Sequence, residues 1–329
     1  MTPASKLLEK IRGLRVLIVG DICLDRWCRY SPPHAEASRE TGIPRIAVVR
    51  TGTTAGAAGT IANNLAALGA GHISVLGAIG DDGFGFELSR ALSGRGICGD
   101  PIVRTPLIQT FTYTKLINDE SGVEDLPRVD FINASDLPME VESQLVDKFE
   151  TIAGSFDLVI VSDQAETVTG GVVTPALRDA VCRHAERHLV WADSRIRSER
   201  FRKAVVKPNE KEGEAASIRA VGRVDFQAFR KHLQSPLLIV TRGGAGASIY
   251  DSEGERLIPG AKIANPVDIC GAGDSFTAGA AAALKITGSP DDAVRFGNLV
   301  ASITVMKAGT GTASPAEILE AEKRWSTEQ

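Results

Sequence analysis

The sequence holds few cysteines and no long apolar run, and both shortages narrow the class of protein. The five cysteines are scattered among 329 residues and lack C-x-x-C spacing, which argues against a disulfide framework and a structural zinc site. The five histidines likewise lack the spacing of metal ligands. No uninterrupted apolar run approaches the roughly 18–20 residues needed to span a bilayer. We therefore expect neither a membrane protein nor a disulfide-bonded scaffold.

The chain also lacks an excess of positive charge. Its 37 lysines and arginines stand against 41 acidic residues, and the formal net charge is −4. This balance gives no electrostatic reason to expect nucleic acid or an anionic membrane as a partner. The N-terminal residues lack the apolar core of a secretory signal, so we expect the protein to act in the cytoplasm.

Motifs that often identify other enzyme classes give no support here. The sequence has no G-x-x-x-x-G-K-[ST] phosphate-binding loop, and its glycine-rich segment 55–59 does not follow the G-x-G-x-x-G spacing of dinucleotide-binding folds. It also has no G-x-S-x-G nucleophile elbow. A nicotinamide-dependent oxidoreductase and a serine hydrolase are therefore poor interpretations of this chain.

The residues that are present alternate between two kinds of segment. Apolar content of 43% and charged content of 24% are ordinary for a soluble globular chain. Short β-branched runs predict buried strands, and helical patterns lie between several of them. The alternation predicts an α/β fold, a three-layer, doubly wound and mostly parallel sheet with helices on both faces. The predicted strands are 14–20, 73–77, 157–162, 188–192 and 237–241, and the predicted helices are 5–11, 59–68, 85–93, 140–152, 175–186, 226–233, 274–286 and 291–305.

Two regions depart from this alternation of strands and helices. Residues 45–50 alternate like an exposed strand, and 107–117 followed by 127–132 do the same. Each region lies next to an element of the main sheet, so these strands could fold over its carboxyl edge as a small lid. The resulting expectation is one domain over 1–329, with lid strands from about 26–54 and 103–132 inserted in it.

The most informative stretch runs from Val267 to Gly279, where Asp268 and Asp274 bracket a Gly-Ala-Gly turn. The small apolar residues that follow predict a helix, so the amides of residues 271–273 would lie unpaired at its positive end. Such a helix start binds anions. A carboxylate beside an anion site makes sense if Asp274 removes a proton from the group that attacks the anion, which describes phosphoryl transfer to a hydroxyl. The simpler alternative is a glycine-rich cap whose Asp stabilises the helix start.

Two acids follow the first predicted strand. Asp21 and Asp25 lie at its carboxyl end, where α/β sheets place their ligands, and a carboxylate there can accept two sugar hydroxyls. Capping of a loop or helix is an equally good account of them. A glycine-rich turn around Gly56 precedes the helix 59–68 and would let a ligand approach the backbone closely.

Two further segments fit a nucleotide. Asn209 and Glu212 lie three residues apart at a loop-to-helix junction, where Glu212 could hold Mg²⁺ through water and Asn209 could face phosphate. A helix that begins after Pro with a capping Asn is the commoner meaning of this pattern. A strand that ends at Thr241 runs into the glycine turn of Gly243 and Gly246, which could wrap a phosphate or make a β-hairpin.

The order of these fragments is more specific than any one of them. An Asp after the first strand, a glycine-rich helix start, a K-P-N-x-x-E segment, a T-x-G-x-x-G turn and a D-x-x-G-A-G-D helix start follow one another over nearly the whole chain. This order resembles the ribokinase family, also called the PfkB carbohydrate kinases. Within that family the chain is most similar to the kinase domain of bacterial heptose-7-phosphate kinases, on the segments 19–26, 114–116, 128–131 and 162–163.

The resemblance implies a ribokinase-like kinase that uses ATP, Mg²⁺ and K⁺. Asp274 would be the general base, and the amides of Gly271, Ala272 and Gly273 would form the anion hole for the transferred group. On the acceptor side, the implied residues are Asp25, Asp21, Gly56, Ala57, Thr60, Lys115 and Asp163. On the ATP side, they are Asn209, Thr241, Gly243, Gly246, Val267 and Asn298. Glu212 would position Mg²⁺ through water, and the implied ligands of a monovalent cation are Asp268, Cys270, Val305 and Gly309.

The acceptor half departs from the family pattern. The usual paired glycines read Gly56-Ala57 here, and the Asn expected a few residues later falls on Thr60. Asp163 is followed by Gln164 in place of the Tyr of heptose kinases. The sequence therefore predicts an ATP-dependent sugar or sugar-phosphate kinase. Heptose-7-phosphate kinase and nucleoside kinase are alternatives within that class, and a non-catalytic sugar or nucleotide sensor is the alternative outside it.

The predicted lid carries charge and exposed edges. Lys115, Arg128 and Arg39 lie in or near it, where they could meet a substrate phosphate or remain as solvated surface residues. Exposed strand edges often pair between subunits, so we expect a homodimer formed through the lid strands.

Overall fold

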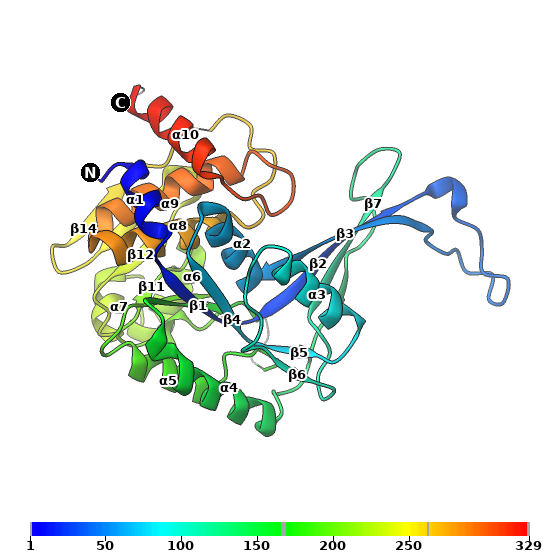
Figure 1. Cartoon of the computed structure of the whole chain (residues 1–329), viewed down its shortest axis with the longest axis horizontal. Helices are drawn as coiled ribbons and strands as arrows, with labels where there is room; N and C mark the ends of the chain where they lie inside the picture. Colours follow the sequence, from blue (N-terminus) through cyan, green and yellow to red (C-terminus); the bar gives the residue numbers. More distant parts are fainter. Residues whose placement is uncertain (1, 166–168, 262, 328–329) are drawn as a thin grey trace.

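The computed structural model describes residues 2–165, 169–261 and 263–327, and its centre is an eight-stranded sheet (Figure 1). The strand order is β14-β13-β12-β11-β10-β9-β1-β4. Neighbours from β4 to β12 pair in parallel, whereas β12, β13 and β14 form an antiparallel edge. The strands are β1 (Arg15–Gly20), β4 (His72–Leu76), β9 (Leu158–Asp163), β10 (Val190–Ser194), β11 (Val205–Val206), β12 (Leu238–Thr241), β13 (Ala247–Tyr250) and β14 (Glu255–Ile258).

The central strands are buried on both faces, as their continuous apolar runs predict. In β1 every residue after Arg15 is buried. Its side chains alternate between two cores, because Val16 and Ile18 face one core and Leu17 and Val19 face the other. The prediction of a three-layer α/β fold is confirmed.

Helices cover both faces of this sheet (Figure 1). One layer consists of α1 (Ala4–Ile11), α2 (Ala58–Leu68), α8 (Ala272–Thr287), α9 (Pro290–Thr304) and α10 (Pro315–Thr327). The other consists of α4 (Met139–Ile152), α5 (Pro175–His184), α6 (Glu210–Val221) and α7 (Phe226–His232). Helix α3 (Gly83–Ser93) packs near the small sheet of β5 (Ala78–Gly80) and β6 (Val103–Thr105).

The predicted helices are present, with ends that differ by a few residues. Helix α10, the last helix of the chain, was not among the predicted helices, because its apolar periodicity is weak. Ile318 is the one fully buried side chain among those described in it. Within the described ranges, no helix combines the length and the apolar character that crossing a membrane demands.

Small residues let α8 and α9 approach each other closely. A Cβ atom added at Gly279 would lie 2.7 Å from Cγ2 of Val300, and one at Gly297 would lie 2.9 Å from the ring of Phe276. The alanines of α8 are buried in the same contact. The composition that predicts a helix here therefore also sets how deeply α8 lies in the core, and hence where its first turn is held.

A second sheet of four strands extends away from the main body (Figure 1). Its order is β3-β2-β7-β8, with β2 antiparallel to β3 and parallel to β7, and β7 antiparallel to β8. The expected strands outside the main sheet are thus present. They are β2 (Ile22–Tyr30), β3 (Val48–Ala57), β7 (Thr112–Asn118) and β8 (Val129–Phe131).

Two details of this sheet correct the sequence-based expectation. The range 26–54 expected for lid strands includes the second half of β2 but not its start at Ile22, because Asp25, Arg26 and Arg29 interrupt the apolar pattern and a single residue separates β2 from β1. The strand expected at 45–50 instead begins at Val48 and continues to Ala57, since it pairs with β2 along its length. The glycine-rich segment before α2 is therefore strand rather than turn.

Candidate active site

The first turn of α8 is built around a glycine in the left-handed conformation. Gly271 caps the helix with φ +76°, and its carbonyl oxygen accepts a hydrogen bond from the amide of Ser275 at 2.9 Å. Glycine adopts a positive φ without steric cost. A side chain there would also crowd Thr60 and Thr310, whose Cγ2 atoms lie 3.2 Å from the Cβ position. The helix therefore starts two residues before Asp274, and the amides of its first turn point out of the N-terminus.

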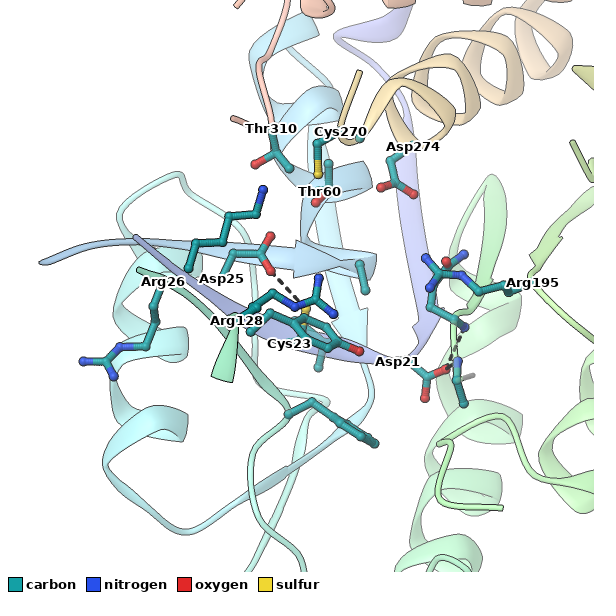
Figure 2. A pocket seen from close by; sticks show the side chains of 18 of the residues that line it. Asp21, Cys23, Asp25, Arg26, Thr60, Arg128, Arg195, Cys270, Asp274 and Thr310 are labelled. Carbon is teal, nitrogen blue, oxygen red and sulfur yellow. Dashed lines mark hydrogen bonds between the residues drawn. The ribbon is translucent and has the colours of Figure 1, made fainter. Parts of the chain in front are cut away.

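A cavity of about 190 Å³ opens in front of this turn (Figure 2). Asp274 and Gly271 line it from α8, Asp25 lines it from β2, and Thr60 lines it from α2. Cationic side chains from separate parts of the chain reach the same space, and these are Lys115, Arg128 and Arg195. The guanidinium group of Arg26 points away from Asp274 and lies against Phe84 and Glu87 of α3 (Figure 2). The cavity combines an acid at a helix start with a group of positive charges, which suits an anionic ligand.

Asp274 has the electrostatics of a base. Its pKa is raised to about 7, chiefly because burial disfavours the charged form. Asp193 and Asp25 also raise this pKa, whereas Lys207 and Arg195 lower it. A carboxyl group whose pKa lies near the working pH is both ionised often enough and basic enough to take a proton. The acid that the sequence places at the helix start therefore lines this cavity with a raised pKa.

Asp25 faces the cavity from β2, where the sequence expects the sugar to be held. Its Oδ1 accepts a hydrogen bond from Sγ of Cys23 at 3.6 Å. Burial raises the pKa of Asp25 to about 6, although Lys115 and Arg128 lower it. A Cβ atom added at Gly56 would lie 2.5 Å from Oδ2 of Asp25, so the glycine makes room for the carboxylate.

Ala57 carries backbone strain at the wall of the cavity. It precedes α2 with φ +53° and ψ −118°, a conformation that residues with a Cβ rarely adopt. The family pattern has a glycine here. The alanine thus keeps a glycine-like backbone and adds a methyl group on the acceptor side of the cavity.

Asp21 lies at the cavity floor, yet its carboxylate is engaged by the main chain. Its Oδ2 accepts hydrogen bonds from the amides of Gln164 at 2.7 Å and Ala165 at 2.9 Å, and its Oδ1 accepts one from the amide of Val172 at 2.7 Å. The residue is 5% exposed. These bonds connect β1 to the segment that follows β9, and the expectation that Asp21 also binds sugar hydroxyls stays a prediction.

Asp163 is also placed differently from the expectation. It is fully buried at the end of β9, forms an ion pair with Arg197 and accepts a hydrogen bond from Oγ of Ser194 at 2.6 Å. The adjacent Gln164 lines the cavity instead. Successive side chains in a strand point to opposite sides, so a shift by one residue decides which of the two reaches a ligand.

The sequence identifies part of the cationic lining and misses the rest. Of the three cations that the sequence suggested for a substrate phosphate, Lys115 and Arg128 line the cavity, whereas Arg39 is exposed in the loop between β2 and β3. Arg195 directly follows β10, at the carboxyl edge where α/β sheets place ligands, and this position was the signal available for it.

The segments expected to bind nucleotide lie side by side at one edge of the main sheet. Oδ1 of Asn209 accepts a hydrogen bond from the amide of Glu212 at 3.0 Å, and Oε2 of Glu212 accepts one from the amide of Asn209 at 2.8 Å. The helix-capping interpretation is therefore confirmed for this pair. The amide of Thr241 bonds to the carbonyl oxygen of Pro208 at 3.1 Å, which joins the end of β12 to the cap.

The glycine turn after β12 contacts α9 through the end of β14. Gly246 has φ +99°, and a Cβ atom there would lie 2.2 Å from the carbonyl oxygen of Ile258. Nδ2 of Asn298 donates to the carbonyl oxygens of Ile258 at 3.4 Å and Pro259 at 3.2 Å. Thr241, Gly246 and Asn298 are thus drawn into one region from three distant parts of the sequence.

Glu212 fits a Mg²⁺ ion that is held mainly by a nucleotide. Burial raises the pKa of Glu212, and Asp193 adds to this effect, so a nearby cation would favour its ionised form. Across the described ranges, no three His, Cys, Asp or Glu side chains gather as a direct metal-ligand set. Mg²⁺ usually binds through one or two carboxylates and substrate phosphates and keeps several waters. A water-mediated role for Glu212 agrees with this mode of Mg²⁺ binding.

The residues expected to hold a monovalent cation lie together, and their role as its ligands stays a prediction. The amides of Val267 and Asp268 both bond to the carbonyl oxygen of Val305, at 2.9 and 3.1 Å. The carboxylate of Asp268 accepts hydrogen bonds from the amides of Cys270 at 2.9 Å and Gly309 at 3.0 Å. Oxygen atoms of Val305 and Asp268 thus accept hydrogen bonds from amides in this conformation.

Comparison with known proteins places the chain in a family. The model of the pfkB family of carbohydrate kinases matches residues 16–317. The bifunctional protein HldE of Trichlorobacter lovleyi is 32% identical over 330 residues, which cover 96% of this chain and 64% of that protein. HldE of Pelobacter propionicus is 30% identical and is covered to 65%. The chain therefore spans just under two thirds of the length of these relatives.

Solved structures show the same fold. The ribokinase of Thermotoga maritima is 20% identical with a TM-score of 0.68, and the match covers 94% of this chain and 99% of that one. Phosphofructokinase-2 of Escherichia coli, solved with potassium, is 18% identical with a TM-score of 0.74 and coverage of 95% and 99%. The chain has the ribokinase-like fold and belongs to the pfkB family of carbohydrate kinases, which are phosphotransferases that act on an alcohol group.

Proposed function

We propose that the chain transfers the γ-phosphoryl group of ATP to a hydroxyl group of a phosphorylated sugar, with Mg²⁺ as cofactor. The observation that carries this proposal is Asp274, a carboxyl group with a pKa of about 7 at the start of α8, which faces a cavity lined by cations. Attack of a hydroxyl on a phosphate needs a proton acceptor next to a site that stabilises negative charge.

In the proposed reaction the acceptor hydroxyl lies between Asp25 and Asp274. Its O–H bond breaks as the proton passes to Asp274, and its oxygen forms a bond to the γ-phosphorus. The bond between the γ-phosphorus and the bridging oxygen breaks, and the electron pair leaves with ADP. The first-turn amides of α8 stabilise the charge on the phosphoryl group during transfer.

The nucleotide fits along the edge formed by Asn209, Thr241 and the turn 243–246. Main-chain amides of a glycine turn can approach phosphate closely. Mg²⁺, when bound, neutralises phosphate charge, and Glu212 would hold it through water. Exclusion of water from the cavity by the second sheet, acting as a lid, would limit wasteful ATP hydrolysis.

A phosphate on the acceptor accounts for the cations in the cavity. Lys115 pairs with Glu124 at 3.5 Å and Arg128 pairs with Asp130 at 2.7 Å, and all four side chains are partly exposed. Ion pairs of this kind contribute little free energy, so a phosphate could compete for both cations. The similarity to heptose-7-phosphate kinase domains favours that sugar phosphate as the acceptor.

Removing these cations is expected to weaken binding of the acceptor selectively. Lys115→Ala and Arg128→Ala should each raise KM for a sugar phosphate about 10–100-fold, because a hydrogen bond to a charged group is worth ~1.5–3 kcal/mol. KM for ATP should not change. Initial rates of ADP release at varied acceptor concentration measure both constants. Arg39→Ala, in the exposed loop between β2 and β3, is the control, and an unchanged acceptor KM in the first two variants would contradict a phosphate site here.

The class of acceptor is decided by an ADP-release screen with Mg²⁺ over sugars, sugar phosphates and nucleosides. The proposal expects the highest kcat/KM with a sugar phosphate, and heptose 7-phosphate above the others. A preference for a nucleoside would favour the alternative within the kinase class. Saturable binding of a sugar or nucleotide without ADP release would point to a sensor.

We also propose that two copies of the chain associate through the second sheet. Its edge strand β3 exposes Val48 and Val49 at 45% and 47%, and an exposed apolar edge favours pairing. Sedimentation velocity over a range of concentrations should show a dimer, and a monomer throughout would contradict the proposal.

A further inference from the structure

A buried lysine stands beside the first turn of α8. Lys207 directly follows β11, and its amide donates to the carbonyl oxygen of Ala192 at 2.9 Å. Its Nζ lies 2.8 Å from Oδ2 of Asp193. A Cβ atom added at Gly273 would lie 3.6 Å from Nζ, so the ammonium group lies directly against the start of the helix.

Asp193 holds this lysine in place relative to α8. Its Oδ2 also accepts a hydrogen bond from Oγ1 of Thr277 at 3.0 Å, and Thr277 lies one helical turn after Asp274. The side chains of Lys207 and Asp193 are only 4% and 8% exposed. The main-chain bond, the ion pair and the threonine together leave Nζ little freedom to move.

The position of this charge is unfavourable by itself. The N-terminus of a helix carries partial positive charge, which repels an ammonium group placed against it. Burial lowers the pKa of Lys207, but Asp193, Glu212 and Asp274 more than compensate, so the pKa is raised and the amine stays charged. Two positive groups therefore face each other, and an anion bound between them would relieve their repulsion.

A purely structural role explains the ion pair but not its location. Replacing a buried ion pair by apolar groups is often neutral or stabilising, so burial of the pair alone is weak evidence of a stabilising role. Lys207 also belongs to the K-P-N segment that carries Asn209 toward the proposed nucleotide edge. Its place between that edge and Asp274 is where the terminal phosphate of a bound nucleotide would have to lie.

We propose that Lys207 is a further catalytic residue, with Asp193 as its positioning residue, and this inference rests on the kinase function proposed above. Nζ of Lys207 and the first-turn amides of α8 bind the γ-phosphoryl group from two sides. As the acceptor oxygen bonds to phosphorus and the bond to the ADP oxygen breaks, the ammonium group stabilises the negative charge on the non-bridging oxygens. Lys207 exchanges no proton, since the proton of the acceptor passes to Asp274.

The kinetic test removes both charges together. Lys207→Met alone would leave Asp193 buried without a counter-charge, so the paired variant Lys207→Met with Asp193→Asn is used. It should lower kcat about 10²–10³-fold, as loss of a group that stabilises developing charge does, with acceptor KM unchanged. Lys207→Arg, which keeps the charge, should retain more activity than the paired variant. Lys203→Met is the matched control, because Lys203 is half-exposed and pairs with Glu186 at 2.6 Å.

A binding measurement separates this role from a structural one. Calorimetric titrations with Mg²⁺ compare ADP with a non-hydrolysable imido analogue of ATP, after circular dichroism has shown that each variant folds. The paired variant should bind the analogue more weakly and ADP as well as the wild type does. Equal losses for the two nucleotides, or an unchanged kcat in the folded paired variant, would overturn the inference. If the wild type releases no ADP with any acceptor, the kinase proposal fails, while the titrations still decide whether Lys207 binds the terminal phosphate.

Discussion

Asp274→Asn is expected to reduce kcat by about 10²–10⁴-fold, the usual contribution of a general base. The amide side chain matches the carboxylate in size but cannot take the acceptor proton, while the first-turn amides of α8 remain in place. Affinity for ATP should therefore be retained. Acceptor-dependent ADP release gives kcat, and calorimetry gives the nucleotide affinity. Asp179→Asn, on the exposed side of α5, is the matched control.

Either of two results would remove Asp274 from this role. A near-normal kcat in the variant would show that another group takes the proton. Loss of ATP binding in parallel with loss of turnover would show that Asp274 contributes to nucleotide binding rather than to deprotonation of the acceptor.

The pH dependence gives a second readout of the same residue. Only the ionised carboxylate accepts a proton, and the pKa of Asp274 is raised to about 7 by burial, Asp193 and Asp25, against Lys207 and Arg195. For the wild type, kcat/KM should therefore fall about tenfold per pH unit below that value. The acid limb should vanish in Asp274→Asn. An acid limb near the ordinary carboxyl pKa of about 4 would contradict the assignment.

The same substitution is expected to stabilise the fold at neutral and alkaline pH. The pKa of Asp274 is about 7 in the folded chain and 3.8 in its ordinary state, so between these values the unfolded chain binds fewer protons. The free energy of unfolding of the wild type therefore falls as the pH rises through this window. Asn carries no such penalty. Thermal unfolding at alkaline pH should show a higher Tm for Asp274→Asn than for the wild type, and no difference at pH below the ordinary carboxyl value.

Asp21→Ala is expected to destabilise the chain strongly. Three main-chain amides, from Gln164, Ala165 and Val172, donate to the Asp21 carboxylate. Each buried donor left unpaired costs ~1–3 kcal/mol, so the loss of all three should lower the free energy of unfolding by about 3 kcal/mol or more. The midpoint of urea denaturation measures this change.

Asp25→Ala is the contrasting variant, because Asp25 faces the cavity and is only partly buried. It should raise acceptor KM while the urea midpoint stays close to that of the wild type. If Asp21→Ala were as stable as the wild type and raised acceptor KM instead, the sugar-binding role that the sequence suggested for Asp21 would be supported, and the structural role would be contradicted.

Elements with a repeating apolar pattern could be predicted from sequence, and those without one could not. The run in β1 and the small residues of α8 each impose one local structure, because burial on both faces, or close packing against α9, tolerates few alternatives. The strand β2 is different. It forms because β3 and β7 pair with it on either side, and partners that lie far along the chain leave no local signal.

The residues of the candidate site likewise fall into those that sequence could predict and those that it could not. Sequence alone determined that an acid stands beside a glycine turn at a helix start, since Gly271 and Asp274 belong to one short segment whose geometry is local. Only the tertiary structure decided that Asp21 holds main-chain amides, that Asp163 is paired away from the cavity, and that Lys207 meets the start of α8 through Asp193. The environment of a side chain, and with it its charge and its partners, depends on residues that the fold brings together from distant parts of the chain.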